Sequence, residues 1–380
     1  MPFQSTIDRS VGKLIKSFRN RDYFGANRLN SVWKTNRVPE NYINVPTAVT
    51  PSGKWDLSKQ GNCIFKLGVN YTITVDMDAG AGSLPVIIHM WGAGGGAGRG
   101  PGNPSGSQLD SSGGGGGYVS APMDWPHGTT YNLRIGNAMG NAPGTSPWGE
   151  PGANGAPNSP GYSPGGGYAG GGYTAFYEGA AGPTPNIRLL AGGGGCGGYN
   201  DGGKQGKGGG GGSPGVNSGD AGDGGSPGGI AASSPFNGEG ASPTAGGAGG
   251  TSPHTNGTAG SALTGGTGGS RGGSGAAGGA GGTGWYGGGG GAGQTSINTD
   301  GGGGGGGTNY VHPSLAPVAT STAASDHNAA SNGIDAYWAG DGPTTGGDVK
   351  RAAGGYWTPG QPDAYTGFGG PGIVVVALNN

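Results

Sequence analysis

The stretch GWYGGGGGAGQTSINTDGGGGGGGTNY at residues 284–310 decides the fold, because it holds two glycine runs and few large side chains. Across residues 191–310, 54 of 120 residues are glycine and only nine are large apolar residues. Ordering the backbone of one residue costs about 1–2 kcal/mol, and glycine costs more than the average. Nine apolar side chains at about 1.5–3 kcal/mol each cannot offset that cost. An ordinary apolar core therefore cannot order this region.

Backbone hydrogen bonds between glycine segments are the remaining source of order. Glycine-rich chains can form a left-handed helix of the polyproline II type, which rises about 3.1 Å per residue and has no internal hydrogen bonds. Such helices can approach closely enough to pair N–H with C=O groups, supported by Cα–H···O contacts. Residues 242–254 break the every-third-glycine rule of collagen, the rival glycine-rich helix. The composition therefore predicts a polyglycine II helix bundle, in which a run such as 301–307 would span about 22 Å.

Short apolar or alternating segments on both sides of this region predict β-strands. They are Tyr71–Met77, Leu84–Trp91, Tyr118–Ala121, Tyr131–Ile135, Tyr173–Tyr177, Ile187–Leu190 and Ile373–Leu378. Strands of this length with Gly and Pro between them are typical of a sandwich. The expected fold is therefore mainly β plus irregular structure: a β-sandwich that carries the polyglycine II helix bundle, with a short α-helical N-terminal module.

The expected domains follow the changes in composition. They are 1–66 as an N-terminal attachment module, 67–190 as the β-sandwich with glycine-rich excursions, 191–365 as the polyglycine II bundle with exposed loops, and 366–380 as the closing β-strand of the sandwich. Residues 5–19 predict one amphipathic helix, because its apolar residues share one face at 3.6 residues per turn. These apolar residues are Ile7, Val11, Leu14, Ile15 and Phe18. The helix could dock on a partner protein, lie on a membrane or pack on its own domain.

Charge and cysteine content exclude several classes of protein. Residues 1–66 carry 11 Lys and Arg against four Asp and Glu, whereas residues 67–380 carry eight against 16. Nucleic-acid binding needs clustered cations, so the main body is not expected to bind nucleic acid. Two cysteines, Cys63 and Cys196, are too few for a disulfide framework. The chain opens on no secretory signal and its apolar runs are too short for membrane insertion, so we expect folding in a cytoplasm.

Motif matches to enzyme sites fail on their surroundings. GAGGGA at 92–97 fits the dinucleotide fingerprint, but residues 99–104 cannot form the helix that must follow. Gly-x-Ser-x-Gly occurs four times. Three copies place proline after the serine, where the oxyanion hole needs an N–H, and the fourth has no strand ahead of it. The five histidines are scattered, without metal-ligand spacing. We therefore expect no catalytic residue, no metal site and no cofactor.

Aromatic residues stand as islands between the glycine blocks. If glycine runs cross a bundle, these islands lie where the chain turns, at its ends. Exposed rings suit flat saccharide or protein surfaces because they give contact area at low entropy cost. The alternative is that the rings only cover the ends of the bundle. The expected binding residues are Trp148, Tyr162, Phe236, Trp285, Tyr286, Tyr337, Trp338, Tyr356 and Trp357.

The sequence VIIHMWGAGGGAG at 86–98, the glycine run at 113–118, the strand at 130–135 and GGPGIVVV at 369–376 resemble the glycine-rich domains of bacteriophage virion proteins. The layout is similar to the tail-fibre adhesins of T-even-type phages, in which an attachment module and a β layer carry a polyglycine II bundle whose distal loops bind bacterial receptors. Glycine-rich ectodomains of some animal receptor tyrosine kinases share the Trp-Gly-Ala-Gly-Gly pattern but carry disulfides, which two cysteines do not favour.

The resemblance implies a non-enzymatic virion protein made in the host cytoplasm, namely a tail-fibre or tail-tip adhesin. Its partners would be other virion proteins, bound through the N-terminal helix, and a host-surface glycan or outer-membrane protein. The alternative is a structural capsid or tail decoration (cement) protein without its own receptor. The sequence leaves the oligomeric state open. A trimer suits a fibre or a three-fold capsid site, and a monomer suits a fibre tip.

Overall fold

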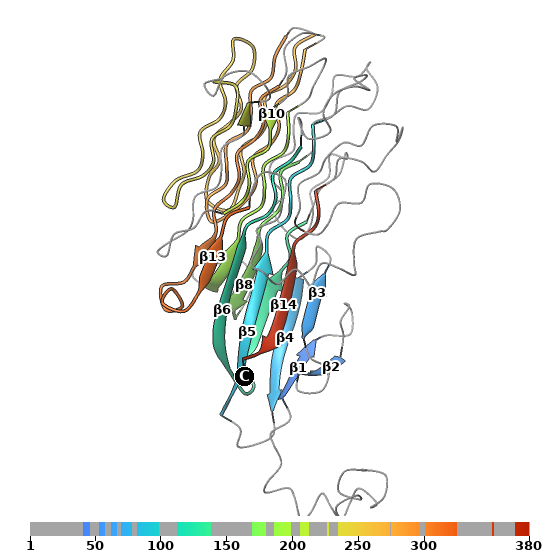
Figure 1. Cartoon of the computed structure of the whole chain (residues 1–380), viewed down its shortest axis with the longest axis vertical. Helices are drawn as coiled ribbons and strands as arrows, with labels where there is room; N and C mark the ends of the chain where they lie inside the picture. Colours follow the sequence, from blue (N-terminus) through green and yellow to red (C-terminus); the bar gives the residue numbers. More distant parts are fainter. Residues whose placement is uncertain are drawn as a thin grey trace, which may run out of the picture.

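In the computed structural model, the described residues are mainly β-strands in two antiparallel sheets, with almost no helix (Figure 1). The structure describes residues 41–45, 53–57, 62–66, 70–77, 82–98, 112–137, 169–179, 186–198, 206–212, 226–227, 235–273, 275–295, 301–324, 352 and 369–379. The sheets lie together, and glycine-rich segments run away from them along the long axis of the molecule (Figure 1).

The two sheets contain seven and five strands. The seven-stranded sheet has the order β12-β9-β8-β7-β4-β1-β2. Its strands are β1 (Asn41–Val45), β2 (Gly53–Asp56), β4 (Asn70–Met77), β7 (Thr130–Arg134), β8 (Thr174–Glu178), β9 (Ile187–Ala191) and β12 (Tyr310–Val311). The five-stranded sheet has the order β13-β6-β5-β14-β3. Its strands are β3 (Cys63–Lys66), β5 (Ser83–Trp91), β6 (Tyr118–Pro126), β13 (Thr320–Thr322) and β14 (Ile373–Leu378). Outside both sheets, β10 (Gly206–Lys207) pairs with β11 (Ser226–Pro227).

All seven strands predicted from the sequence are present, and β6 continues to Pro126 instead of ending at Ala121. Strands β1, β2 and β3 come from residues that the sequence analysis placed in the N-terminal module. They belong to the sheets, because β1 pairs with β4 and β3 pairs with β14. The helix predicted at 5–19 lies outside the described residues.

One apolar core receives side chains from both sheets. Ile73 and Val75 of β4 and Val86 of β5 are fully buried in it. Trp125 of β6 stacks on Phe176 of β8, with ring centroids 5.6 Å apart and an interplanar angle of 3°, so the two sheets touch through this pair. The ordinary hydrophobic contribution to stability is therefore concentrated at the sheet end of the molecule.

Glycine segments extend the strands and change the hydrogen-bond repeat. Beyond the paired ends of β5 and β6, the N–H of Gly92 donates to the carbonyl of Gly117 at 3.0 Å. The next bond between these two segments runs from Gly95 to Gly114, at 2.8 Å, so the repeat is three residues. Hydrogen bonds between two antiparallel β-strands recur every two residues, so the glycine segments have a different backbone geometry from the strands they continue.

Segment 286–294 is surrounded by six other segments. Its residues 287, 288 and 289 donate backbone hydrogen bonds to the carbonyls of Ser261, Gly282 and Glu239, respectively. The carbonyls of the same three residues accept bonds from Gly247, Gly266 and Gly305. Three consecutive residues thus face six neighbours, and the backbone polar groups of this segment are satisfied between segments instead of within one.

This arrangement leaves no room for a side chain at many interior glycine positions, although small side chains such as those of Cys196 and Ala280 are buried among the segments. A Cβ built on Gly304 would lie far inside van der Waals contact with the carbonyl oxygen of Ala280, and one built on Gly291 would collide in the same way with Gly302. Gly82, by contrast, is exposed and has no atom within 4 Å of an added Cβ.

We expect Gly304→Ala to lower the free energy of unfolding by at least about 2 kcal/mol, because the new methyl group must displace hydrogen-bonded backbone. The control Gly82→Ala should change it by less than about 1 kcal/mol, since only the entropy of the unfolded chain changes there. Thermal melts of the two variants measure the difference. Equal small shifts would show that residues 301–307 are not packed between neighbours.

The two cysteines lie in different parts of the molecule, one between the sheets and one among the glycine segments. Cys63 is fully buried in the core between the sheets, whereas Cys196 is fully buried among the glycine segments, and both are free thiols. Burial raises the pKa of the Cys63 thiol to about 12. Thiolate is the reactive form of cysteine, and burial also blocks access to both sulfur atoms.

We therefore expect neither thiol of the native protein to react with a disulfide reagent at pH 8, and both to react in denaturant. Peptide mapping of the labelled protein during gradual heating would show which part opens first. Rapid labelling of Cys196 in the native state would contradict its burial among the glycine segments.

Candidate functional site

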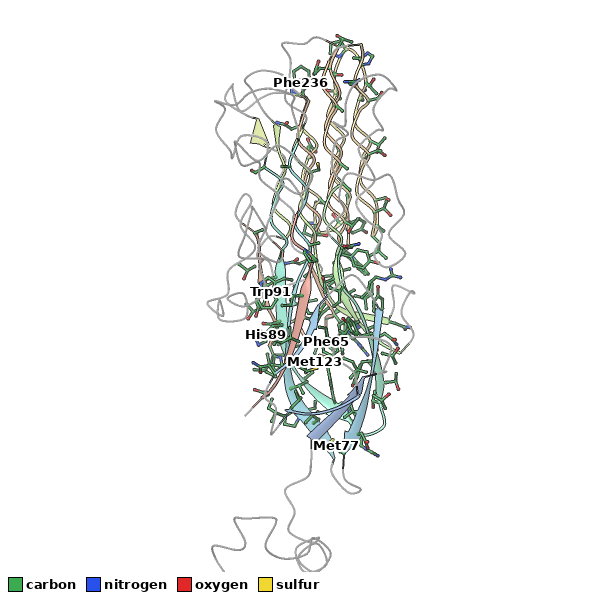
Figure 2. All side chains as sticks on the ribbon, turned by 90° about the vertical axis from the view of Figure 1, so that its right-hand side faces the viewer. Phe65, Met77, His89, Trp91, Met123 and Phe236 are labelled. Carbon is green, nitrogen blue, oxygen red and sulfur yellow. The ribbon has the colours of Figure 1, made fainter. Side chains whose placement is uncertain are left out.

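Several turns meet where the glycine segments end, on the side away from the sheets. We define the far-end surface as residues 235–237, 251–256, 270–273 and 294–295. Figure 2 places Phe236 near this end and Met77 of β4 at the opposite end of the molecule. The N–H of Thr251 donates to the carbonyl of Pro235 at 2.6 Å, so neighbouring turns are bonded to each other.

Ser252 organises the turn at 251–256. Its hydroxyl accepts hydrogen bonds from the N–H groups of His254 and Thr255, both at 3.1 Å, and donates to the carbonyl of Gly293 at 2.7 Å. The N–H of Ser252 itself donates to the side-chain oxygen of Asn256 at 2.8 Å. Short side-chain to backbone bonds of this kind hold turns in one shape. The turn is therefore both internally fixed and tied to segment 286–294.

The adjoining turn at 270–273 packs against the first. The His254 ring occupies the space in which a side chain on Gly272 would lie, and the N–H of Gly272 donates to the carbonyl of Gln294 at 3.1 Å. Gln294 is only 6% exposed, and its side-chain nitrogen has no hydrogen-bond partner. A buried amide without a partner is costly, so the far-end surface holds an unused donor.

The chemistry of the far-end surface is polar and contains no pair of acidic groups. Its exposed side chains include Thr251, His254, Asn256, Ser270 and Thr295. Arg271 is its one lysine or arginine side chain, and no aspartate or glutamate lies within the residues that define it. Hydroxyl, amide and imidazole groups suit hydrogen bonding to a polar ligand. Within the described part of the chain, no group of three or more His, Cys, Asp or Glu could hold a metal ion.

The aromatic residues predicted to bind a ligand do not come together. Phe236 lies at the far end, whereas Trp285 and Tyr286 lie beside the seven-stranded sheet, where Tyr286 forms a bridge to Ala262. The other predicted binding residues lie outside the described residues: Trp148, Tyr162, Tyr337, Trp338, Tyr356 and Trp357. The predicted attachment residues Ile7, Val11, Leu14, Ile15 and Phe18 also lie outside them.

Trp285 belongs to a second group of side chains, which lies at the sheet end of the molecule. Trp285 stacks on Tyr310 of β12, with centroids 4.0 Å apart and planes 15° from parallel. Both rings pack on the outer face of the seven-stranded sheet, against Tyr173, Tyr177 and Leu190. In Figure 2, the labelled Trp91 and His89 of β5 lie below the glycine segments, in the part of the molecule formed by the sheets.

Charged and polar groups adjoin this stack. Arg188 of β9 donates through Nε to Oε2 of Glu178 at 2.6 Å, and its Nη1 lies 3.1 Å from the ring nitrogens of His312. Burial and then the neighbouring Arg188 lower the pKa of His312, while Glu178 acts in the opposite direction. Burial raises the pKa of Tyr310, against the effect of Arg188. The pKa of His312 is thus lower than usual, which favours the neutral ring, and the Arg–Glu pair carries no net charge.

Most of these polar residues were not identified from the sequence, which drew attention to aromatic residues only. One usable signal was present: Thr and Ser recur every three residues at 255, 258 and 261 and again at 264, 267 and 270. The two rows lie side by side, since the N–H of Thr258 donates to the carbonyl of Thr267 at 2.9 Å. This spacing marks an outer edge of the glycine segments and thereby locates the turns between them.

No protein-family model matches the sequence, and no curated protein matches it significantly. Within the described residues, the structure contains no helix long and apolar enough to cross a membrane.

Proposed function

We propose that this chain is a non-enzymatic bacteriophage virion protein, a tail-fibre or tail-tip adhesin that binds a host-surface receptor through the far-end surface. The observation that carries the proposal is the hydrogen bonding of segment 286–294 to six neighbours, which fixes the turns at one end of the molecule. A ligand site built on fixed backbone loses little entropy on binding. Polar turns on a rigid support are therefore suited to recognition.

The fold that supports this function is proposed to be a β-sandwich carrying a polyglycine II helix bundle. The shared core of the two sheets and the Trp125–Phe176 stack between them favour the sandwich. The three-residue repeat and the bonds between segments favour polyglycine II, because this helix has three residues per turn and no internal hydrogen bonds. Close approach of glycine backbones also allows Cα–H···O contacts, which stabilise the bundle further.

The composition of the far-end surface guides the choice of receptor. Hydroxyl and amide side chains dominate it, and the exposed ones include Thr251, Asn256 and Thr295. These groups fit the hydroxyl and carbonyl groups of a surface glycan or the loops of an outer-membrane protein. In the same proposal, the N-terminal residues, including Ile7 and Phe18, attach the chain to other virion proteins.

A binding experiment tests the adhesin proposal directly. Labelled full-length protein would be mixed with a panel of bacterial strains, and the amount adsorbed would be measured by flow cytometry. The variant His254→Ala/Thr295→Ala removes two exposed far-end side chains and should reduce adsorption to a positive strain at least tenfold. The matched control Thr244→Ala/Thr264→Ala removes two exposed side chains from turns at the sheet end and should adsorb like the wild type.

A structural decoration protein is the second candidate, and the same experiment separates the two. The observation that favours it is the set of glycine segments joined by backbone hydrogen bonds, which we call the lattice. The lattice would make a rigid surface layer even without a receptor. If no strain adsorbs the protein, while the protein still binds phage particles that lack it, the decoration function is correct. Equal adsorption of the far-end variant and the control would also overturn receptor binding through the far-end surface.

A further inference from the structure

We propose that the sheet end of the molecule carries a second ligand site, and that this site binds a neutral saccharide. We define the junction surface as Trp285, Tyr310, Arg188, Glu178 and His312. It lies on the outer face of the seven-stranded sheet, at the opposite end of the glycine segments from the far-end surface. The proposal does not depend on the adhesin function, because it concerns different residues at a different place.

The stacked rings provide a platform for a sugar ring. Trp285 and Tyr310 are both partly exposed and pack against the cluster that contains Tyr173, Tyr177 and Leu190. Because the two rings stack on each other, each covers one face of its neighbour, and a sugar ring would meet the outer face of the pair. Rings fixed in this way offer a large apolar contact area at low entropy cost, with a polar edge for hydrogen bonding. The C–H faces of pyranose rings are the chemistry that such a platform fits.

Strand register places the polar groups next to the platform. Tyr310 of β12 pairs with Leu190 of β9, and two residues further along the N–H of His312 donates to the carbonyl of Arg188 at 2.8 Å. Residues two apart in a strand share one face and lie about 7 Å from each other. Tyr310, Arg188 and His312 therefore form one continuous surface about the size of a saccharide unit.

The polar cluster keeps hydrogen-bonding capacity for a ligand. Arg188 is 28% exposed and Glu178 is 48% exposed. Glu178 receives both bonds from Arg188 on Oε2, which leaves its Oε1 without a bond from any other described residue. Arg188 has five N–H groups, of which three are directed at Glu178 and His312. A fixed carboxylate oxygen beside guanidinium N–H groups can accept from and donate to adjacent sugar hydroxyls.

Charge selects a neutral ligand over an acidic one. The positive charge of Arg188 is compensated by Glu178, and burial and Arg188 lower the pKa of His312, which favours its neutral form. An acidic saccharide would gain no net attraction at this surface and would meet the exposed carboxylate of Glu178. A neutral saccharide needs only the hydrogen bonds and ring contacts that the surface provides.

Backbone strain beside the platform supports a functional role. Leu263 has φ of 60°, a left-handed conformation that is costly for leucine, in a chain with 102 glycines. Its N–H donates to the carbonyl of Trp285 at 3.2 Å, and its side chain packs on the same cluster. Glycine at position 263 would remove the strain, but it would also remove the contact with the cluster. We infer that the leucine side chain is needed at this position because it holds Trp285 in place.

Binding of the full-length protein to a glycan array, followed by calorimetry with the best neutral oligosaccharide, tests the proposal. We expect a neutral glycan to bind, and Trp285→Ala, Arg188→Lys and Glu178→Gln each to weaken its binding at least fivefold. Arg188→Lys keeps the charge but loses the planar fork of N–H groups. Glu178→Gln changes an exposed side chain, so it remains informative if Trp285→Ala does not fold.

The controls distinguish this site from the far-end surface. The variant His254→Ala/Thr295→Ala should bind the neutral glycan like the wild type, even if cell adsorption is lost. Unchanged affinity in Glu178→Gln and Arg188→Lys would overturn the proposal. So would the absence of any neutral ligand on the array, or stronger binding of sialylated and sulfated glycans than of neutral ones.

Discussion

The hydrogen bond from one glycine backbone to the backbone of a neighbouring segment is the interaction on which the rest of the structure depends. Each such bond contributes only about 0.5–1.5 kcal/mol net, which is no more than the cost of ordering a residue. The lattice is therefore stable only if nearly every N–H and C=O is paired and the segments are in close contact, so that dispersion adds to the bonds. A single Cβ at Gly304 would disrupt both contributions at once.

The sheets give this lattice its starting register. The pairing of β5 with β6 passes directly into the bonds between segments 92–98 and 112–117. Asn309, fully buried at the same boundary, accepts from the N–H of Gly192 through Oδ1 and donates through Nδ2 to the carbonyl of Tyr118. The apolar core thus fixes where each segment begins, and the side-chain amide joins the two sheets to the lattice. Hydrophobic burial is concentrated in the sheets, and most backbone pairing between glycine segments lies outside them. The two are linked because the strands set the register in which the glycine segments pair.

The sequence predicted the parts of the fold that side chains specify. Alternation along residues such as Ile73 and Val75 gave strands at the correct positions, and the glycine content led to the expectation of lateral backbone bonding. Neighbour relations within the lattice could not be predicted, because a glycine residue carries no side chain that selects one partner over another. The few side chains that do select partners, such as Asn237 bonding to Gly303, are recognisable only once the segments are aligned. For the same reason, Phe236 and Trp285 could not be assigned to opposite ends: each crossing reverses the chain direction, so the end depends on the number of crossings.

The two ends of the glycine segments differ in how far their side chains serve stability. Sheet-end turns carry partly buried side chains, such as Leu263 and Trp285, whose packing joins the glycine segments to the outer face of the seven-stranded sheet. Far-end turns, such as 251–256, are held by their own polar bonds and by the backbone of segment 286–294. Exposed residues like His254 and Thr295 therefore contribute little to the core and can change without loss of the fold. The interior of the glycine segments admits glycine and a few small side chains such as those of Cys196 and Ala280. Sequence variation, and with it the capacity for new recognition, is therefore concentrated at the turns.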